Sequence, residues 1–470
     1  MSDDVTDDQA PVVSRNPADP SDTVLRTAAP GAFAALAAVE SARRAQRDWL
    51  YAGAAARSAA LTGVADAVEA AADELTALAV REVGKPVTEA RAEVHRTVAI
   101  WRYYAQTPYD PSGAVHETAA GPGLLLTRRR PYGVAGLITP WNFPFAIPSW
   151  KAAPALAAGN AVVLKPAPEA TACAQRLSEL VQRALPAGVF TVLPGGATEG
   201  EAVVSSADIV SFTGSTAVGQ AVARAAGARG VPVQAEMGGL NAAIVLPDAD
   251  METAAAHLAS AIAGYAGQKC TATSRVIAVG AALDPLREAL AERLRTLTVG
   301  DPADPATVCG PLISERARDR VAEARRGLPE AAVSRAPDEG GWYTAAALVE
   351  KAPDDHPLLR EEVFGPLAVL MAADSTDQAV RIANSVPYGL VTSVHTASLD
   401  AALYGLDGLD TGMIRVNAPS SGVDFHLPFG GTKDSSHGPR EQGRAALDFY
   451  TSSRTWTLTP SHPRAPAKTT

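Results

Sequence analysis

The feature that most constrains this chain is a regular alternation of short apolar runs and helical patterns between residues 133 and 249. The apolar runs read GVAGLITP, NAVVLKP, GVFTVLPG, ADIVSFTG and NAAIVLPD. Runs of this kind are typical of strands buried on both faces of a parallel sheet. Between them lie segments with helical spacing, such as TACAQRLSELVQRAL and TAVGQAVARAAGA. The alternation predicts an α/β fold built on a doubly wound sheet.

The chain has 470 residues, so it has room for further structure on both sides of this region. Helical spacing is found from residue 32 to about 84 and again over 88–104. A second α/β region is expected over 240–440, followed by a proline-rich tail. Residues 1–29 are rich in aspartate and proline, and we expect them to form a loosely held arm.

Charge and composition exclude several classes of protein. The formal net charge of −10 argues against a nucleic-acid partner, because no basic excess is available to neutralise phosphates. Residues 131–150 form an uncharged run of membrane-spanning length, but four prolines interrupt it. We expect a buried strand followed by a turn there, and no membrane contact. The N-terminus lacks the pattern of a signal peptide, and the three cysteines form no CxxC pair. A cytoplasmic protein without disulfides or a metal site is expected.

Cys270 lies in the stretch AGQKCTATSR, among small and polar neighbours. Free cysteine usually behaves as a small buried hydrophobe, which is one interpretation of this residue. The other is a nucleophilic thiolate, which needs access and an electropositive surrounding that lowers its pKa. The stretch alone leaves both open.

Two polar residues follow apolar strands of the predicted sheet. Asn142, in TPWNFPFAIPSWK, could cap a turn or could donate its amide N–H to a developing oxyanion. Lys165, in NAVVLKPAPEAT, could be a solvated side chain or a cation that faces a nucleotide. Ligands of open α/β sheets bind at the carboxyl ends of the strands, where both residues lie.

Two further stretches contain residues that could have either a structural or a functional role. In SFTGSTAVG, Gly214 and Ser215 are expected at a helix N-terminus, where Ser215 could cap the helix or a phosphate could bind. In VPVQAEMGGLNAAIV, Glu236 ends a strand-like run. A carboxylate in such an apolar setting is expected to have a raised pKa and to take a proton from water, although an exposed surface glutamate is the alternative.

Taken in order, these stretches resemble the aldehyde dehydrogenase superfamily over nearly the whole chain. Six motifs match at the family's spacing: PWNFP, FTGST, EMGG, GQKC, EEVFGP and PFG. The resemblance implies a Rossmann-type cofactor domain, an α/β catalytic domain and a small β element for oligomerisation. It also implies oxidation of an aldehyde to the free acid through a cysteine thiohemiacetal and thioester. Relatives that transfer the acyl group to coenzyme A generally lack the glutamate base, so Glu236 favours hydrolysis.

The resemblance assigns catalytic roles to five residues. Cys270 is similar to the family's nucleophile and Glu236 to its general base. Asn142, with the backbone N–H of Cys270, corresponds to the oxyanion hole. Lys151 and Glu441 match positions that move protons away from the base, although the segment SSHGPRE before Glu441 is one residue longer than usual.

The resemblance also implies a nicotinamide cofactor, NAD or NADP. Lys165 would hold the adenosine ribose, and Gly214, Ser215 and Gly219 would lie around the pyrophosphate. Glu362 would bind the nicotinamide ribose, with Phe364 beside the nicotinamide. The remaining cofactor positions implied are Ile138, Thr139, Pro140, Trp141, Pro168 and Gly238. Many NAD-preferring relatives have an acid where this chain has Pro168, so NADP is not excluded.

By the same resemblance, the substrate tunnel is largely apolar with modest polarity. Its implied lining is Phe143, Ala146, Ile147, Trp150, Lys269, Thr271, Val423 and Phe429. The stretches around Cys270 and over 417–441 look most like the branch that oxidises α-ketoglutaric semialdehyde. The motifs place no arginine that would hold a substrate carboxylate, and the lining by itself equally suits an aliphatic or aromatic aldehyde. The region 327–349 is shorter than usual and could form a rim of the site or only a surface loop.

The family pattern divides the chain into three parts. The predicted cofactor-binding domain covers 1–112 and 132–237, and the catalytic domain covers 238–441. Residues 113–131 and 442–470 are the expected oligomerisation element of a homodimer or homotetramer.

Two other classes of function are open to this sequence. One is a non-redox cysteine hydrolase or acyltransferase on the same scaffold, and the other is a catalytically idle scaffold or binding protein. The latter would require the loss of Asn142, Glu236 or Cys270, and all three are present.

Overall fold

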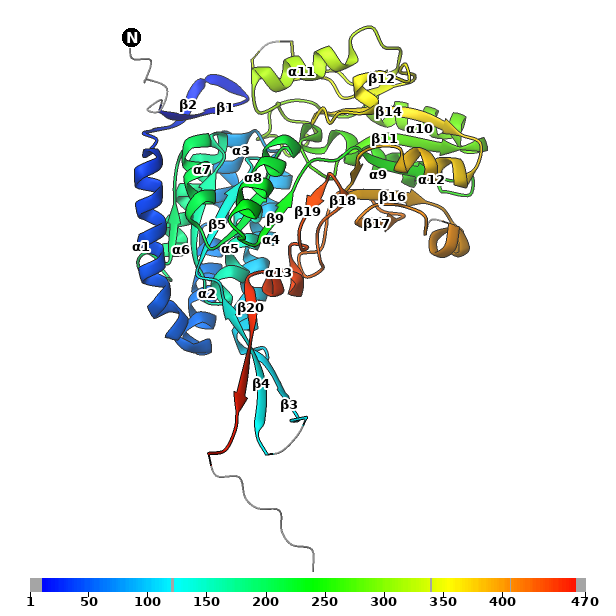
Figure 1. Cartoon of the computed structure of the whole chain (residues 1–470). Coiled ribbons are helices and arrows are strands. Elements are labelled where there is room, and N and C mark those ends of the chain that lie inside the picture. Colours follow the sequence, from blue (N-terminus) through cyan, green and yellow to red (C-terminus); the bar gives the residue numbers. More distant parts are fainter. Residues whose placement is uncertain (1–10, 120–121, 339, 406, 462–470) are drawn as a thin grey trace, which may run out of the picture.

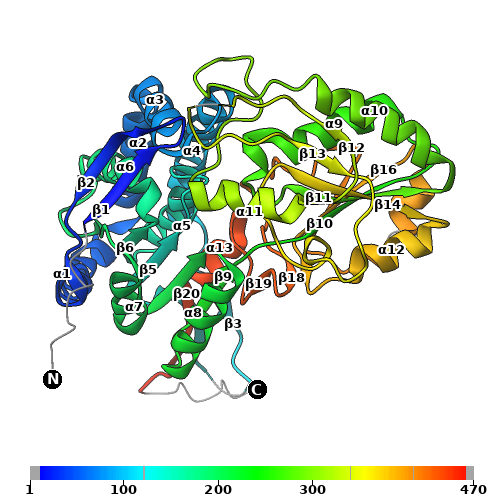
Figure 2. The same ribbon diagram turned by 90° about the horizontal axis from the view of Figure 1, so that it is seen from above.

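Two lobes, each built on a mainly parallel sheet, lie side by side in the molecule (Figures 1 and 2). A computed structural model describes residues 11–119, 122–338, 340–405 and 407–461. The predictions made for residues 1–10 and 462–470 therefore lie outside the described residues. Within the described chain, no helix combines the length and the apolar character needed to cross a bilayer.

The first sheet has six strands in the order β19-β9-β8-β5-β6-β7. The strands are β5 (Val134–Thr139), β6 (Ala161–Pro166), β7 (Phe190–Val192), β8 (Ile209–Thr213), β9 (Val233–Glu236) and β19 (Ser436–His437). All pair in parallel except β19, which runs antiparallel to β9. Numbered along the chain, the parallel strands have the order 3-2-1-4-5, which is the 3-2-1-4-5-6 order of a doubly wound dinucleotide-binding sheet without its last strand. The predicted α/β fold is confirmed, and the strand order reverses between β5 and β8.

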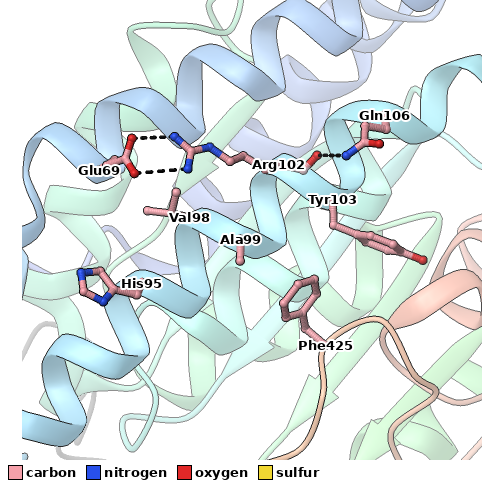
Figure 3. Close-up of a pocket in the computed structure, with 8 residues that line it drawn as sticks. All are labelled: Glu69, His95, Val98, Ala99, Arg102, Tyr103, Gln106 and Phe425. Carbon is pink, nitrogen blue, oxygen red and sulfur yellow. Dashed lines mark hydrogen bonds and ion pairs between the residues drawn. The ribbon is translucent and has the colours of Figure 1, made fainter.

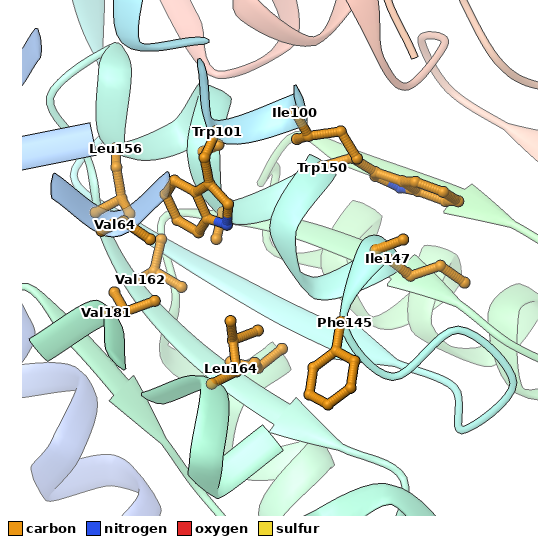
Figure 4. Packing of buried hydrophobic residues seen from close by; sticks show 14 of the residues in the cluster. Val64, Ile100, Trp101, Phe145, Ile147, Trp150, Leu156, Val162, Leu164 and Val181 are labelled. Carbon is orange, nitrogen blue, oxygen red and sulfur yellow. The ribbon is translucent and has the colours of Figure 1, made fainter. Parts of the chain in front are cut away.

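Helices cover both faces of this sheet. They are α1 (Gly31–Tyr51), α2 (Gly53–Ala70), α3 (Ala72–Val83), α4 (Val87–Gln106), α5 (Ala146–Ala157), α6 (Thr171–Gln182), α7 (Ala197–Ser206) and α8 (Thr216–Ala228). Figure 4 shows Trp101 of α4 and Phe145 beside α5 in the apolar cluster that includes Leu164 of β6. The Trp101 indole N–H donates to the Ser149 hydroxyl at 2.9 Å. Helix α4 thus supports α5, the helix that follows Asn142.

The second sheet has seven strands in the order β12-β13-β14-β11-β10-β16-β17. Its strands are β10 (Asn241–Val245), β11 (Thr273–Val279), β12 (Glu330–Val333), β13 (Ala347–Val349), β14 (Leu367–Ala373), β16 (Val391–His395) and β17 (Met413–Val416). Side chains of β10 alternate between two apolar clusters, Ala243 and Val245 in one and Ala242 and Ile244 in the other. The first cluster includes α9 (Met251–Ala263) and α10 (Leu283–Arg295), and the second α12 (Thr376–Asn384). The predicted second α/β region is therefore confirmed.

A three-stranded antiparallel sheet projects from the body of the molecule (Figure 1). It consists of β3 (Gly113–His116), β4 (Leu124–Pro131) and β20 (Thr451–Leu458), in the order β20-β4-β3. Helix α13 (Gly443–Phe449) precedes β20 and packs near α5. Part of the expected proline-rich tail is therefore a strand.

The expectation of a loose N-terminal arm is wrong for its described part. Strands β1 (Val12–Asn16) and β2 (Asp19–Thr27) form an antiparallel hairpin, in which Val12 and Ser14 are buried. The Trp342 backbone N–H donates to the Pro17 carbonyl at 3.0 Å, so the hairpin contacts the second lobe. This contact places Trp342, and with it part of the region 327–349, against the hairpin. Strands β12 and β13 belong to the same region and lie at one end of the second sheet.

The uncharged run 131–150 is only partly as expected. It contains the buried strand β5 and then a turn, but helix α5 begins at Ala146 before the run ends. Pro148 lies in the first turn of that helix, where a missing backbone N–H costs no intrahelical hydrogen bond. The prolines therefore position the start of α5 and do not exclude it.

Candidate active site

The carboxyl ends of β5 and β8 form the crevice where the strand order of the first sheet reverses. Thr139 ends β5 and Thr213 ends β8, and the buried hydroxyl oxygens of both have no hydrogen-bond partner among the described residues. Ser215 occupies the N-cap position of α8, yet its side chain makes no capping hydrogen bond. The capping role considered for Ser215 is therefore wrong, and the hydroxyls that end β5 and β8 have no partner among the described residues.

Asn142 contacts the segment that carries Cys270. The Asn142 side chain is buried, and its Nδ2 donates to the Gln268 carbonyl at 2.8 Å. Asn142 Oδ1 is buried and has no partner among the described residues. An Asn that only capped its own turn would bond within a few residues, whereas this amide bonds 126 residues away. The turn-capping interpretation is wrong.

Two residues that sequence reasoning missed fix the backbone at Cys270. Asn241, at the start of β10, donates from Nδ2 to the carbonyls of Cys270 at 2.7 Å and Ala272 at 2.8 Å. The Ser420 hydroxyl donates to the Thr271 carbonyl at 2.6 Å. The signal for Asn241 was the sequence GGLN, in which one leucine separates two glycines from a polar residue that opens an apolar run.

The surroundings of Cys270 differ from the electropositive ones expected. Burial raises the pKa of the Cys270 thiol, and the negative charges of Glu362 and Glu236 raise it further. The residue is partly exposed, whereas Cys173 and Cys309 are buried, and all three are free thiols. Of the three cysteines, Cys270 alone combines some access with nearby carboxylates.

Glu236 is buried at the end of β9, so the surface-glutamate interpretation is wrong. Burial raises the pKa of Glu236 well above its usual value, and the charge of Glu441 adds to this effect. Glu236 Oε2 accepts a 2.6 Å hydrogen bond from the Ser436 hydroxyl. Glu236 Oε1 is buried without a partner among the described residues. This oxygen therefore has unused hydrogen-bonding capacity within the described chain.

Lys151 and Glu441 form a buried ion pair, so the longer SSHGPRE segment still brings Glu441 to Lys151. The Lys151 ammonium also donates to the Ser211 hydroxyl at 2.7 Å. The Trp150 indole N–H donates to Glu441 Oε2 at 2.7 Å. Burial lowers the pKa of Lys151, while the Glu441 charge opposes that change. The charges of both Lys151 and Glu441 also act on Glu236.

A cavity of about 180 Å³ opens at Cys270. Its walls include the expected tunnel residues Phe143, Ile147, Trp150, Lys269, Thr271, Val423 and Phe429. Ala146 was also expected there, but it is fully buried in the core at the start of α5 and is not part of the lining. The structure brings the other seven to one cavity with the thiol.

Arg96 of α4 also lines this cavity, which contradicts the expectation that no arginine is placed to meet a substrate. Four charged side chains lie in the wall: Glu89, Glu93, Arg96 and Lys269. Lys269 pairs with Glu89 at 2.8 Å, and Glu93 pairs with Lys85. Arg96 makes no hydrogen bond or ion pair with any side chain or backbone group in the described part of the chain. Burial lowers its pKa. Helical spacing alone gave no signal for it.

Arg102, two turns further along α4, shows the contrast. It lines a larger surface groove of about 530 Å³ with Tyr103 and Phe425, and Figure 3 shows its guanidinium paired with Glu69. None of the residues proposed from the sequence lies in that groove. Size therefore does not identify the reactive cavity, whereas the position of Cys270 does.

Residues expected at the cofactor lie along the crevice and beside Cys270. Lys165 is buried and donates to the Gly195 carbonyl at 3.3 Å, so it is not a solvated lysine. Glu362 Oε1 accepts from the Gly239 backbone N–H at 3.1 Å, and burial raises its pKa to about 7. A Cβ at Gly238 would lie 1.9 Å from Glu362 Oε2, so a side chain there would require the Glu362 carboxylate to move.

Further candidate cofactor residues pack close to these. The rings of Trp141 and Phe364 meet edge to face, with centroids 5.8 Å apart. A Cβ at Gly219 would approach the Met237 side chain to 2.6 Å, and one at Gly214 would approach the Phe212 ring equally closely. Ile138 and Pro140 flank Thr139 at the end of β5, and Pro168 opens a short 3-10 helix after β6. Among these candidates, Phe364 comes from the second lobe, and the others lie in β5 or in segments that follow strands of the first sheet.

Comparison with known proteins agrees with this geometry. The model of the aldehyde dehydrogenase family matches residues 5–456. The chain belongs to the aldehyde dehydrogenase family. A Bacillus subtilis (strain 168) relative named alpha-ketoglutaric semialdehyde dehydrogenase is 39% identical over 453 residues, covering 94% of this chain and 93% of the relative. A Haloferax volcanii alpha-ketoglutarate semialdehyde dehydrogenase is 37% identical and covers 94% of each chain.

Solved structures agree as well. The crystal structure of an NAD-dependent aldehyde dehydrogenase from Sinorhizobium meliloti superposes with a TM-score of 0.92 at 32% identity. The match covers 98% of this chain and 93% of that one. This aldehyde dehydrogenase is thus an oxidoreductase acting on aldehydes, and the expected α/β architecture is confirmed. The non-redox hydrolase alternative is not favoured.

Proposed function

We propose that this aldehyde dehydrogenase converts its substrate to the free acid through a thioester on Cys270, with NAD or NADP as the oxidant. The observation that carries the proposal is the hydrogen bond from the Asn142 amide to the backbone of Gln268, two residues before Cys270. It supports an oxyanion site beside the one cysteine that opens into the cavity.

The first step forms a bond between Cys270 Sγ and the aldehyde carbon. The thiol proton leaves, and the carbonyl oxygen becomes negatively charged. The second N–H of the Asn142 amide and the backbone N–H of Cys270 stabilise that charge. Glu236, whose charge is felt at Cys270, is the proposed acceptor of the thiol proton. The thiohemiacetal carbon then loses its hydrogen with the bonding electron pair, which leaves a thioester.

The second step hydrolyses the thioester. Glu236 first passes the thiol proton toward the Glu441–Lys151 pair and so regains its carboxylate form. Glu236 then takes a proton from water, the water oxygen bonds to the acyl carbon, and the C–S bond breaks with its electron pair left on the sulfur. The raised pKa of Glu236 suits a base that must accept this proton near neutral pH. The proton then passes toward the Glu441–Lys151 pair, whose charges interact with Glu236. Cys270 is regenerated as the acid leaves.

The cofactor supplies hydride acceptance when bound. The unpartnered hydroxyls of Thr139 and Thr213 at the crevice support a polar ligand there. We propose that Ser215 and the start of α8 hold the pyrophosphate, and that Lys165 and Glu362 hold the two riboses. No acid occupies position 168 to repel a 2′-phosphate, so NAD and NADP are both admitted.

For the substrate, we propose an aldehyde with a carboxylate at its far end, of the α-ketoglutaric semialdehyde type. Arg96 supports this class, because its donors are unfilled while the other charged groups in the wall are paired. Arginine is the side chain suited to bidentate recognition of carboxylates. The names of the two curated relatives point to the same class. A neutral aliphatic or aromatic aldehyde is the competing substrate.

The test is a panel of ketoglutaric, succinic, aliphatic and aromatic aldehydes with NAD and with NADP. Reduced nicotinamide and free acid are expected in equal amounts, with kcat/KM highest for the carboxylate-bearing aldehydes. Acid release without nicotinamide reduction would contradict the proposal. A preference for the aromatic aldehyde would retain the activity and overturn the substrate class.

We also propose that the projecting sheet formed by 113–131 and the C-terminal strand makes the enzyme a homodimer or homotetramer. The sheet exposes large apolar side chains, Val115, Leu124, Trp456 and Leu458. Exposed apolar surface of this kind is typical of association sites. Light scattering should give the mass of a dimer or tetramer, and Trp456→Asp should lower it. A monomeric wild-type protein would contradict the proposal.

A further inference from the structure

A carboxylate from α4 binds the start of α5. Glu93 Oε1 accepts the backbone N–H groups of Phe145 at 2.9 Å and Ala146 at 3.0 Å. These groups belong to the N-terminal turn of α5, where no side chain of the segment's own provides a cap. A helix N-terminus carries unpaired N–H groups and a partial positive charge, so an anion is stabilising there. Glu93 therefore determines where α5 begins, directly after the turn that carries Asn142.

The other oxygen of Glu93 pairs with Lys85, and both side chains are buried. The Lys85 ammonium lies 3.8 Å from the Phe143 ring centroid and 4.7 Å from the Tyr265 ring centroid. Cations positioned over aromatic faces in this way are attracted to them, most strongly when water is excluded. The pair thus contacts Phe143, which neighbours Asn142, and Tyr265, five residues before Cys270.

The Tyr265 side of this contact is itself constrained. Tyr265 and Ala266 have φ values of 54° and 52°, in the left-handed region that L-residues seldom adopt. The Tyr265 hydroxyl donates to the Val83 carbonyl at 3.0 Å, two residues before Lys85. Surrounding contacts must hold such a backbone in place. Two of these contacts are made by the Tyr265 side chain, its ring with the Lys85 ammonium and its hydroxyl with the Val83 carbonyl.

We propose that the Lys85–Glu93 ion pair is a positioning device that sets the Asn142 amide against the Cys270 thiol. A buried ion pair is a costly way to stabilise a core, because apolar residues of similar volume often do as well or better. This pair joins the two chain segments that must meet for oxyanion stabilisation. The inference rests on the proposed function, in which Asn142 and Cys270 act on the same carbonyl group.

The chain offers a matched control in Glu82. This buried carboxylate accepts the backbone N–H groups of Ala172 and Cys173, each at 2.7 Å, at the start of α6. It therefore does for α6 what Glu93 does for α5. Helix α6 carries none of the five proposed catalytic residues. Glu82→Gln removes a comparable charge without altering the contact between the Asn142 and Cys270 segments.

The experiment compares Glu93→Gln, Lys85→Met and Glu82→Gln at saturating cofactor. The readouts are the single-turnover rate of nicotinamide reduction, the aldehyde KM and Tm. Glu93→Gln and Lys85→Met are expected to slow the single turnover by about 10²-fold, as small misplacements of reacting groups do, with much smaller changes in KM. Glu82→Gln is expected to lower Tm similarly while retaining the rate.

Glu93→Asp keeps the charge but shortens the reach, and it serves if the other variants do not fold. An intermediate single-turnover rate is expected for it. Rates that fall only in proportion to Tm, as in Glu82→Gln, or rates that do not change, would overturn the positioning role. Failure of the wild-type enzyme to reduce nicotinamide with any aldehyde would instead refute the proposed function. In that case the alkylation rate of Cys270 in each variant still reports the geometry.

Discussion

The Asn142 amide donates a 2.8 Å hydrogen bond to the carbonyl of Gln268, two residues before Cys270. Gln268 is fully buried, and its own side chain accepts the Ile313 backbone N–H and donates to the Pro311 carbonyl. The end of β5 is thereby fixed to the segment before β11, across the junction of the two lobes. One N–H of the amide is used in this contact, and the other is available to a substrate oxygen.

Replacing Asn142 tests the oxyanion role. Asn142→Ala removes one donor and is expected to lower the rate of nicotinamide reduction by about 10²- to 10³-fold. The aldehyde KM is expected to change far less, because the donor acts mainly on charge that develops in the transition state. Stopped-flow single turnovers measure this rate. A loss expressed only in KM would contradict the assignment.

Ser436 provides a test of the general base that leaves the carboxylate in place. The Ser436 hydroxyl lowers the pKa of Glu236, opposing the larger effect of burial. Ser436→Ala removes that hydrogen bond, so the pKa of Glu236 rises further. Because the base acts when ionised, the rising limb of the deacylation rate should move to higher pH. An unchanged pH profile would mean that Glu236 does not govern this step.

Glu362 predicts a pH dependence of cofactor binding. Burial raises its pKa to about 7, so the carboxylate form that accepts ribose hydroxyl groups appears as pH rises through about 7. The cofactor KM should therefore fall over this range, and Glu362→Gln should abolish the dependence. Without cofactor, the buried Glu362 carboxyl is harder to ionise in the folded chain than in the unfolded chain. The free energy of unfolding should therefore fall as pH rises from about 4.5 to about 7. A cofactor KM independent of pH in the wild type would contradict the role.

Arg96 predicts a specificity difference. Arg96→Met should reduce kcat/KM roughly 10- to 100-fold for aldehydes with a distal carboxylate, the range for losing hydrogen bonds to a charged group. Neutral aldehydes should be affected little. Arg102→Met is the control on the same helix, because Arg102 pairs with Glu69 outside the cavity. Equal losses for both aldehyde classes would show that Arg96 supports the fold only.

Strong periodicity explains which parts of the fold were predictable. Strand β6 is buried along its whole length and β5 at every position but Ile138, so both appear as nearly continuous apolar runs. The motif residues follow such strands or turns and were located with them. The β1–β2 hairpin was missed because β2, DPSDTVLRT, has no buried residue and carries charged residues and a proline. Its pairing depends on contacts with the rest of the fold.

Side chains that act through long-range contacts were not predictable. Arg96 sits in a helix whose sequence gives no reason to distinguish it from Arg91 or Arg102. Arg96 is distinguished only in the folded chain, where the other charged side chains of the cavity wall are paired and Arg96 has no partner among the residues that the structure describes. The acidic surroundings of Cys270 also arise only when β9 and the Glu362 segment meet in space. The prediction for Ala146 was wrong for the same reason. Within the first turn of α5, Ala146 faces the core whereas Ile147 lines the cavity.

The central claim is that an acyl group is bound covalently to Cys270 before water releases it. Glu236→Gln keeps the thiol and the oxyanion donors but removes the base, so hydride transfer should proceed once, slowed by the loss of the thiol's proton acceptor, and then stop. Mass spectrometry of this variant, quenched after mixing with aldehyde and cofactor, should find the acyl group on the peptide that contains Cys270. The mass of that peptide should increase by the mass of the aldehyde less two hydrogens, one from the thiol and one from the aldehyde carbon. Acid production without any such adduct, or with the adduct on another residue, would contradict the account.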